Sequence, residues 1–394
     1  SNQRCHPYQA MTTAQTEAVT WKIHPAIGIA RVGNSPSDFF VAPELLEPNE
    51  ASVTAHKDAG DPKSLRLPGI KRQAARFRIY AYDASDRCLG EVTADSTVTI
   101  SWTVTLANRK ASAPRADAPL AGHASGRQPL RNKDVRGGDR SRLEITPRPR
   151  QLSGIDQRAA FDGGRFMDIP VSLGEIRTDA HGRLLVLGGL GRAGTCDATK
   201  RIRSHIDNDG WYDDVSDGPV TAAITLADGR AVQAVPSWVV VAPPDFAPGI
   251  RPVATLFDVL VDRAIGSGMR RAPWRPAFHR DIRPILERAI SMQWLDRSAL
   301  LVVDHHPHLR NWPAGLAELA SNAAAARQSR ESVLSGLTKH QGSRWLKLTQ
   351  HQFELLQHWA AGEFETDDAA AAEDGHSRPM SEPANLDRAS LEAC

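Results

Sequence analysis

Apolar residues change their spacing near Pro243 and Pro244, and this change constrains the fold more than any other feature of the chain. Before it, short segments alternate apolar with polar residues, which is typical of half-buried strands. The clearest alternation is Val98, Ile100, Trp102, Val104 and Leu106. After it, apolar residues recur at helical spacing over 255–265, 281–292, 315–327 and 349–361. The sequence therefore predicts an α+β protein whose β-rich N-terminal two-thirds forms sandwich-like sheets and whose C-terminal region is helical.

Composition divides the chain further. Residues 107–150 are rich in Arg, Ala, Gly and Pro and show no periodicity, so we expect an exposed segment whose positive charge is solvated. We predict, in order, a disordered leader (1–20), an N-terminal β region (21–106), an exposed connection (107–150), a second β region (151–243) and a helical region (244–394) that ends at Cys394.

The charge balance and the lack of long apolar segments narrow the class of protein. The chain has 394 residues, with 48 Lys and Arg against 46 Asp and Glu, so a nucleic-acid partner is not expected. No apolar run approaches the roughly 20 residues that cross a bilayer, so we expect no membrane insertion. No signal peptide is visible, and the protein is either cytoplasmic or exported without one. A homo-oligomer is compatible with this composition.

Two motifs resemble ligand-binding sequences, but the residues around each of them do not support such a site. Residues 189–194 (GLGRAG) match the G-x-G-x-x-G dinucleotide pattern. The residues that follow do not predict the helix on which a pyrophosphate would sit, so a tight β-turn is favoured over a nucleotide site. Residues 304–308 (DHHPH) cluster metal-capable side chains, but their spacing predicts a junction between a helix and a loop, and we expect no metal site. The 4 cysteines are far apart and predict neither a disulfide framework nor zinc.

The segment 208–214 (NDGWYDD) concentrates turn formers, carboxylates and two aromatic side chains. Trp211 and Tyr212 between acids suit an amine ligand, which charge and ring faces would hold. A calcium-like surface loop, or a surface loop capped by its own acids, explains the same residues. Sequence reasoning leaves both interpretations open.

Longer blocks occur in a fixed order along the chain. They are Ile23–Ser35 (IHPAIGIARVGNS), Pro68–Tyr80 (PGIKRQAARFRIY), Leu106–Asn108 (LAN), Leu173–Asp179 (LGEIRTD), Asp209–Asp214 (DGWYDD), Ser216–Val220 (SDGPV), Val241–Pro248 (VAPPDFAP) and Leu386–Cys394 (LDRASLEAC). This series resembles the LodA-type quinoprotein amino-acid oxidases, the family of lysine ε-oxidases and glycine oxidases. The resemblance extends from about Trp21 to the end of the chain.

The resemblance implies an L-lysine 6-oxidase-like enzyme with a cysteine tryptophylquinone, a cofactor made from the protein's own Cys and Trp side chains. Such an enzyme oxidises a primary amine with O2 and releases peroxide and ammonia. Cys394 occupies the position of the family's cofactor cysteine. The partner Trp lies beyond that cysteine in the family, so the resemblance implies a C-terminally truncated chain that is inactive by itself.

The resemblance also implies roles for residues near these blocks. The family places an acid just upstream of the cysteine; Ser390 stands one turn before Cys394, so Asp387, two turns before it, is the candidate acid. Tyr212 is expected near the substrate entrance, with charge around it shaped by Asp213 and Asp214.

The implied partners are a free amino acid or a peptide-borne amine, and a flavoprotein that oxygenates the Trp during cofactor maturation. The alternative function is a non-catalytic homologue that binds an amine or a protein partner.

Overall fold

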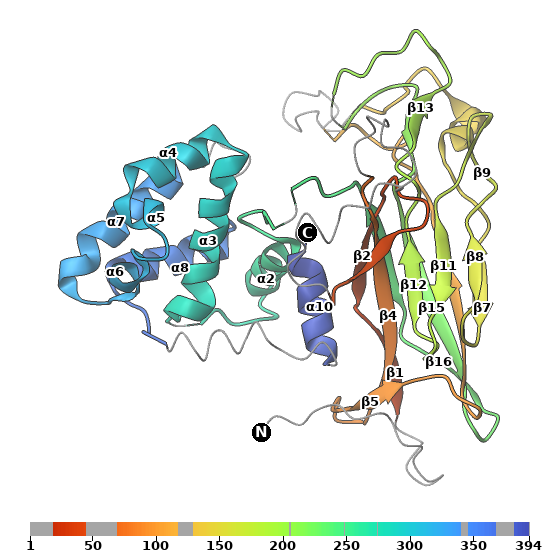
Figure 1. Cartoon of the computed structure of the whole chain (residues 1–394), viewed down its shortest axis with the longest axis horizontal. Coiled ribbons are helices and arrows are strands. Elements are labelled where there is room, and N and C mark those ends of the chain that lie inside the picture. Colours follow the sequence, from red (N-terminus) through yellow and green to blue (C-terminus); the bar gives the residue numbers. More distant parts are fainter. Residues whose placement is uncertain are drawn as a thin grey trace, which may run out of the picture. The chain divides into compact units, whose positions relative to one another are not determined.

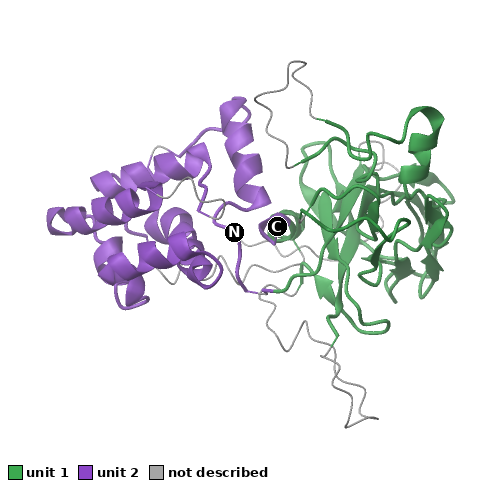
Figure 2. Ribbon diagram, turned by 90° about the horizontal axis from the view of Figure 1, so that it is seen from above, with its two compact units in different colours: residues 1–246, 381–390 green, residues 247–380, 391–394 purple. Residues whose placement is uncertain are grey.

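The computed structural model describes residues 19–44, 69–116, 129–204, 206–247, 249–273, 275–339, 346–367 and 382–393. The chain divides into two compact units (Figure 2): unit 1 contains residues 1–246 and 381–390, and unit 2 contains residues 247–380 and 391–394. Most of the predicted leader and Cys394 itself lie outside the described residues.

The described residues of unit 1 form strands, the short 3-10 helix η2 (Gly137–Leu143) and most of one α-helix near the C-terminus, which is given below (Figure 1). The strands are β1 (Thr20–His24), β2 (Ile27–Arg31), β3 (Phe39–Ala42), β4 (Arg72–Tyr82), β5 (Cys88–Val92), β6 (Thr99–Val104), β7 (Arg150–Ser153), β8 (Arg158–Ala160), β9 (Gly164–Phe166), β10 (Ile169–Val171), β11 (Glu175–Thr178), β12 (Leu184–Leu187), β13 (Ala193–Thr195), β14 (Trp211–Asp213), β15 (Ser216–Thr225), β16 (Ala231–Gln233) and β17 (Ser237–Ala242).

Thirteen of these strands form one sheet, with the order β7-β6-β15-β17-β2-β4-β12-β11-β8. The long strand β4 also pairs with β1, β3 and β5, and β16 extends β15. Only the β17–β2 and β3–β4 pairs among these are parallel. At the two ends of the order, β7 and β8 lie side by side, because Arg150 of β7 hydrogen-bonds to the carbonyl of Ala160 in β8. The predicted sandwich-like layers are thus parts of one sheet that curls almost closed.

The core of unit 1 follows the alternation of its strands. In β6 the side chains of Ile100, Trp102 and Val104 are buried and those between them are not. Successive residues of a strand point to opposite faces, so this pattern places one face on the core and the other toward solvent. Trp102 is fully buried and donates its indole N–H to the carbonyl of Gly182. The predicted β-rich N-terminal region is confirmed.

The sequence pattern of residues 169–176 indicates one strand, but the structure interrupts it. The apolar run 169–176 contains β10 and β11, which are separated at Gly174. The φ of Gly174 is +105°, a conformation that residues with a side chain rarely adopt. A Cβ atom there would also lie 2.1 Å from the carbonyl oxygen of Leu187. The run of apolar residues concealed this glycine break.

Unit 2 is helical, which confirms the second part of the predicted fold class. Its helices are α2 (Leu256–Gly266), the π-helix η3 (Phe278–Ile282), α3 (Arg283–Ser291), η4 (Met292–Trp294), α4 (Arg297–His305), α5 (Pro307–Arg310), α6 (Leu316–Ala320), η5 (Ala324–Ala326), α7 (Arg327–Lys339) and α8 (Gln350–Ala361). Thr349 caps α8 through a capping box with Gln352, and Gly362 ends it in the left-handed conformation. These local signals were readable from the sequence.

One helix of the predicted helical region belongs to the other unit. Helix α10 (Pro383–Glu392) lies mostly within residues 381–390, which group with the sheet of unit 1. The contacts responsible join residues more than 360 positions apart. Periodicity over a short window does not reveal them. Within the described residues, no helix has both the length and the apolar character needed to cross a bilayer.

Candidate functional site

Two cavities of unit 1 meet at Tyr212 of β14. The first, here called the Lys110 cavity, has a volume of about 110 Å³ and is lined by residues that include Asn108, Lys110, Arg131, Trp211, Tyr212 and Asp213. The second, the Arg192 cavity, has a volume of about 360 Å³ and is lined by residues that include Arg72, Asp162, Glu175, Arg192, Tyr212 and Asp214. Sites for small ligands usually measure about 300 to 1,000 Å³. The Arg192 cavity is therefore the one that can hold a substrate-sized molecule.

The three predicted substrate-binding residues separate between these cavities. Asp213 lines the Lys110 cavity, Asp214 lines the Arg192 cavity, and Tyr212 borders both. Adjacent residues of an extended chain direct their side chains to opposite sides, which accounts for the separation of the two acids. The ring of Tyr212 packs against Phe166, with 5.4 Å between ring centroids.

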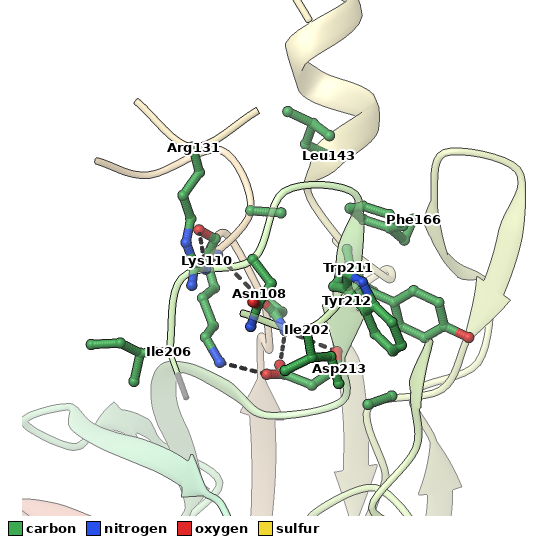
Figure 3. Close-up of a pocket in the computed structure, with 14 residues that line it drawn as sticks. Asn108, Lys110, Arg131, Leu143, Phe166, Ile202, Ile206, Trp211, Tyr212 and Asp213 are labelled. Atoms are coloured by element: carbon green, nitrogen blue, oxygen red, sulfur yellow. Dashed lines mark hydrogen bonds and ion pairs between the residues drawn. The ribbon is translucent and has the colours of Figure 1, made fainter. Parts of the chain in front are cut away.

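The carboxylate of Asp213 already has partners inside the protein. Figure 3 shows Lys110 and Asn108 directed at it from the same loop. The Lys110 ammonium lies 2.5 Å from Asp213 Oδ2, and Asn108 Nδ2 donates to Asp213 Oδ1 at 2.8 Å. A substrate amine would have to displace Lys110, so Asp213 shapes the cavity wall and does not offer a free charge.

Basic residues of the segment 107–150 hold the acidic loop that leads into β14. The pairs are Arg131 with Asp207, Arg115 with Asp209, and Lys110 with Asp213. The segment also buries Leu143 and Ile145 in the core. The prediction that it is an exposed connection with solvated charge is therefore wrong for these described residues, because the compensating acids lie far away in the sequence.

The glycine motif at 189–194 binds an anion, but the anion is the protein's own carboxylate. The backbone N–H of Arg192 donates to Asp214 Oδ2 at 2.9 Å, and the amide of Gly191 also hydrogen-bonds to this carboxylate. The segment continues into strand β13 and not into a helix. The nucleotide alternative is overturned, since the loop amides that would meet a phosphate are occupied.

The first and last glycines of this motif lie so close to residues 212–214 that a side chain in their place would have no space. A Cβ atom at Gly189 would lie 2.3 Å from Asp214 Oδ2, and one at Gly194 would lie 2.9 Å from the Tyr212 hydroxyl. Gly191 between them has a φ of +70°. The two segments that stood out separately in the sequence, 189–194 and 208–214, therefore form one structural element. Burial raises the pKa of the Asp214 carboxyl above its usual value, although the amide hydrogen bonds oppose this effect.

Replacement of Gly189 by alanine should therefore disturb this element. The side chain of Asp214 is only 2% exposed and has little space in which to move away from a new methyl group. We expect the free energy of unfolding to fall by about 1–3 kcal/mol, as for other overpacked sites, measured by urea denaturation. Gly138→Ala is the matched control, because no atom lies within 4 Å of a Cβ there. Equal stability of the two variants would contradict the assignment.

Asp387 of α10 is not among the lining residues of either cavity and anchors the helix to the first two strands. It accepts a hydrogen bond from the backbone N–H of Ala26 at 2.7 Å, and both of its oxygens lie 3.0 Å from His24 Nδ1. The other ring nitrogen of His24 lies 2.9 Å from the hydroxyl of Tyr82. Ser390, one turn later, donates its hydroxyl to the carbonyl of Ile27 and is buried. A carboxylate at position 390 would lack this donor.

Removal of the Asp387 carboxylate should loosen α10. Asp387→Ala leaves the Ala26 amide and the His24 ring without their acceptor, and we expect a loss of about 1–3 kcal/mol in stability. The free energy of the opening that permits amide hydrogen exchange within α10 should fall by the same amount, so that exchange becomes faster. Asp387→Asn keeps one acceptor oxygen and should show a smaller effect. Unchanged exchange in Asp387→Ala would show that the anchor lies elsewhere.

Comparison with known proteins gives this architecture a family. A family model described as L-Lysine epsilon oxidase N-terminal matches residues 24–241, more than half of the chain. The chain belongs to the L-lysine ε-oxidase family. A second model, described as the L-lysine epsilon oxidase C-terminal domain, matches residues 328–394. Both cavities and the glycine motif lie within the first match, and α10 lies within the second.

The relatives of this family are longer than the chain. The L-lysine 6-oxidase of Marinomonas mediterranea is 30% identical over 325 residues, which cover 69% of this chain and 42% of the relative. The crystal structure of the L-Lys ε-oxidase from that organism matches with a TM-score of 0.66 and 25% identity, covering 95% of this chain and 64% of the other. The crystal structure of the Schiff base intermediate of that enzyme with L-Lys gives the same values.

Membership of the family suggests a protein-derived quinone cofactor, and helix α10 leads to Cys394. Cys394 lies outside the described residues, and α10 ends at Glu392, two positions before it. The helix is held by buried contacts of Leu386 and Ser390 in addition to Asp387. The described residues of α10 are thus fixed to unit 1, and a helix fixed in this way fits a cofactor bonded through the cysteine that follows it. Trp102 and Trp359 are fully buried, each with its indole N–H bound to a backbone carbonyl, and have structural roles.

Several residues of the site were not singled out from the sequence. Lys110, Arg115 and Arg131 were assigned to a solvated segment, and Arg192 appeared only inside a glycine motif. The signal that could have identified these basic residues is complementary charge, because the basic segment 107–150 and the acidic segment 207–214 occur in the same chain. Residues 304–308 join α4 to α5, whereas the prediction was a junction between a helix and a loop. Among the described residues, no group of three or more His, Cys, Asp or Glu side chains is placed to hold a metal.

Proposed function

We propose that the protein to which this chain belongs is an amino-acid oxidase with a cysteine tryptophylquinone formed through Cys394. The observation that carries the proposal is the match of both parts of the L-lysine ε-oxidase family in order, on a fold that covers 95% of this chain. In the proposed reaction a primary amine loses two electrons and two protons to O2, which gives hydrogen peroxide. Water then releases the nitrogen as ammonia and leaves a carbonyl product.

The quinone would supply the electrophilic carbonyl that accepts the substrate amine and its electrons. The residues of this chain would hold the substrate. Tyr212 offers an aromatic face to an ammonium group, and Asp214 adds a buried carboxyl to the wall of the Arg192 cavity. Helix α10 would fix the position of the thiol through Asp387 and Ser390. In this proposal Asp387 holds helix α10 in place. The family resemblance, by contrast, suggested that Asp387 is the acid that acts in cofactor maturation.

The test uses the full-length protein co-expressed with the flavoprotein that the family resemblance implies. We expect peroxide and ammonia to appear in equal amounts when a free amino acid is added, with lysine and glycine as the first substrates. Binding of amino acids without any peroxide would favour the alternative function, a non-catalytic amine-binding homologue. Release of peroxide without ammonia would contradict oxidative deamination.

A further inference from the structure

The imidazole of His24, the last residue of β1, lies between a carboxylate and a tyrosine hydroxyl. Its Nδ1 lies 3.0 Å from each oxygen of Asp387, and its Nε2 lies 2.9 Å from the hydroxyl of Tyr82. The rings of His24 and Tyr80 form a T-shaped contact, with 5.7 Å between their centroids. His24 is buried, and Tyr80 is completely enclosed. These contacts fix the orientation of the imidazole from three sides.

The partners of His24 decide which ring nitrogen donates a hydrogen bond. An ionised carboxylate only accepts hydrogen bonds, so Nδ1 carries a proton and donates it to Asp387. Nε2 of the neutral ring then accepts from the hydroxyl of Tyr82. Tyr82 is held in turn, because the ammonium of Lys22 lies 4.4 Å from the centre of its ring. His24 thus presents a fixed donor to helix α10.

His24 and Ala26 hold the carboxylate of Asp387 in different ways. The amide of Ala26 donates to Oδ1, and a single hydrogen bond leaves a carboxylate able to turn about it. His24 Nδ1 is shared between both oxygens, which fixes the plane of the carboxylate. One turn later, Ser390 donates to the carbonyl of Ile27 in β2. Together these contacts set the rotation of α10 about its axis.

We propose that His24 is a positioning residue for the proposed cofactor cysteine, which it orients by donating from Nδ1 to Asp387. Asp387 precedes Cys394 by seven positions and α10 ends at Glu392, so the orientation of this helix determines the direction in which the chain leaves it. His24 acts through Asp387 and is therefore not a catalytic residue. This inference rests on the proposed function, since it concerns the helix that leads to the cofactor.

The first test separates the two ring nitrogens in the purified chain. Asparagine places an amide near the position of Nδ1, and glutamine places one near that of Nε2. We expect amide hydrogen exchange within α10 to become about ten- to a hundredfold faster in His24→Gln, which loses the donor to Asp387. His24→Asn should stay close to the wild-type rate. His181→Gln, which replaces an exposed histidine of the same unit, is the matched control and should change nothing.

The second test follows the alkylation of Cys394 by iodoacetamide in the full-length protein co-expressed with the flavoprotein. A cysteine bonded to the quinone does not react. We expect little alkylation in the wild type and in His24→Asn, and alkylation of most of Cys394 in His24→Gln. If His24 only stabilised unit 1, both replacements would lower the melting temperature, and rescue by asparagine would not be seen.

Two results in the purified chain would overturn the inference: unchanged exchange within α10 of His24→Gln, or equal acceleration in both variants. If His24→Gln does not fold, His24→Asn decides alone. Wild-type protection of α10 in that variant supports the role of Nδ1, and a folded His24→Asn protein that lacks this protection contradicts it.

The outcome is separable from that of the proposed function. If Cys394 resists alkylation equally in the wild type and in a folded His24→Gln protein, the role of His24 is wrong and the oxidase stands. If the wild type releases no peroxide and its Cys394 is fully alkylated, the oxidase is wrong. The exchange measurement then still decides whether His24 orients α10.

Discussion

Replacement of Arg131 by alanine is expected to lower the free energy of unfolding by about 3–5 kcal/mol. Arg131 and Asp207 form an ion pair in which the side chains are 5% and 1% exposed, with Arg131 Nε 2.5 Å from Asp207 Oδ1. Without the guanidinium, the buried carboxylate of Asp207 would lose this ion pair. Arg131 also donates to the carbonyl of Lys110, so its loss releases the backbone that positions Lys110 against Asp213. Urea denaturation measures the change.

Two further variants show whether burial is the cause. Arg142 pairs with Asp168 at the surface, where the side chains are 47% and 85% exposed, and Arg142→Ala should cost less than about 1 kcal/mol. Replacing both partners of the buried pair, as Arg131→Met with Asp207→Leu, should recover most of the stability, because no unpaired charge remains. An Arg131→Ala protein as stable as Arg142→Ala would show that the pair does not hold the loop.

Replacement of Cys394 by alanine is expected to abolish peroxide release by the full-length protein, whatever the amino acid supplied. The proposed cofactor needs the sulfur of Cys394 for its covalent bond, and no other side chain can take its place in that bond. Helix α10 should remain docked, because Asp387 and Ser390 keep their partners in unit 1. The variant should therefore unfold at nearly the same temperature as the wild type while showing no turnover above the uncatalysed rate.

Cys196→Ala is the matched control for a missing thiol. Cys196 is exposed and lies next to β13, in the same unit as the Arg192 cavity but outside its lining. We expect this variant to retain full activity. Turnover at the wild-type rate in Cys394→Ala would exclude the quinone proposal, whereas loss of activity in both variants would point to a general sensitivity to cysteine replacement.

Much of the fold could be predicted because its signals are local. The alternation from Val98 to Leu106 became β6, and the capping box at Thr349 became the start of α8. Predictions failed where one residue interrupted a continuous pattern, as Gly174 does between β10 and β11. The membership of α10 in unit 1 depends on Asp387 contacting residues near the N-terminus, and such a contact leaves no trace in a short window of sequence.

The candidate site was predicted less completely for a related reason. The segment 208–214 was singled out because aromatic residues lie between acids, but the basic partners of Asp209 and Asp213 are 94 and 103 positions away. The glycine motif was interpreted as a tight turn in preference to a nucleotide site, and its amides bind a carboxylate of the protein itself. Its anion is Asp214, a residue of the other segment. Each segment was interpreted alone, whereas the chemistry of each is determined by the other.

The most direct test of the account is the mass of the peptide that contains Cys394, measured after digestion of the full-length protein co-expressed with its flavoprotein. The account predicts that this peptide is covalently joined to a second peptide through an oxidised tryptophan, and that iodoacetamide does not alkylate Cys394. Complete alkylation of Cys394 in a preparation that releases peroxide from an amino acid would contradict it.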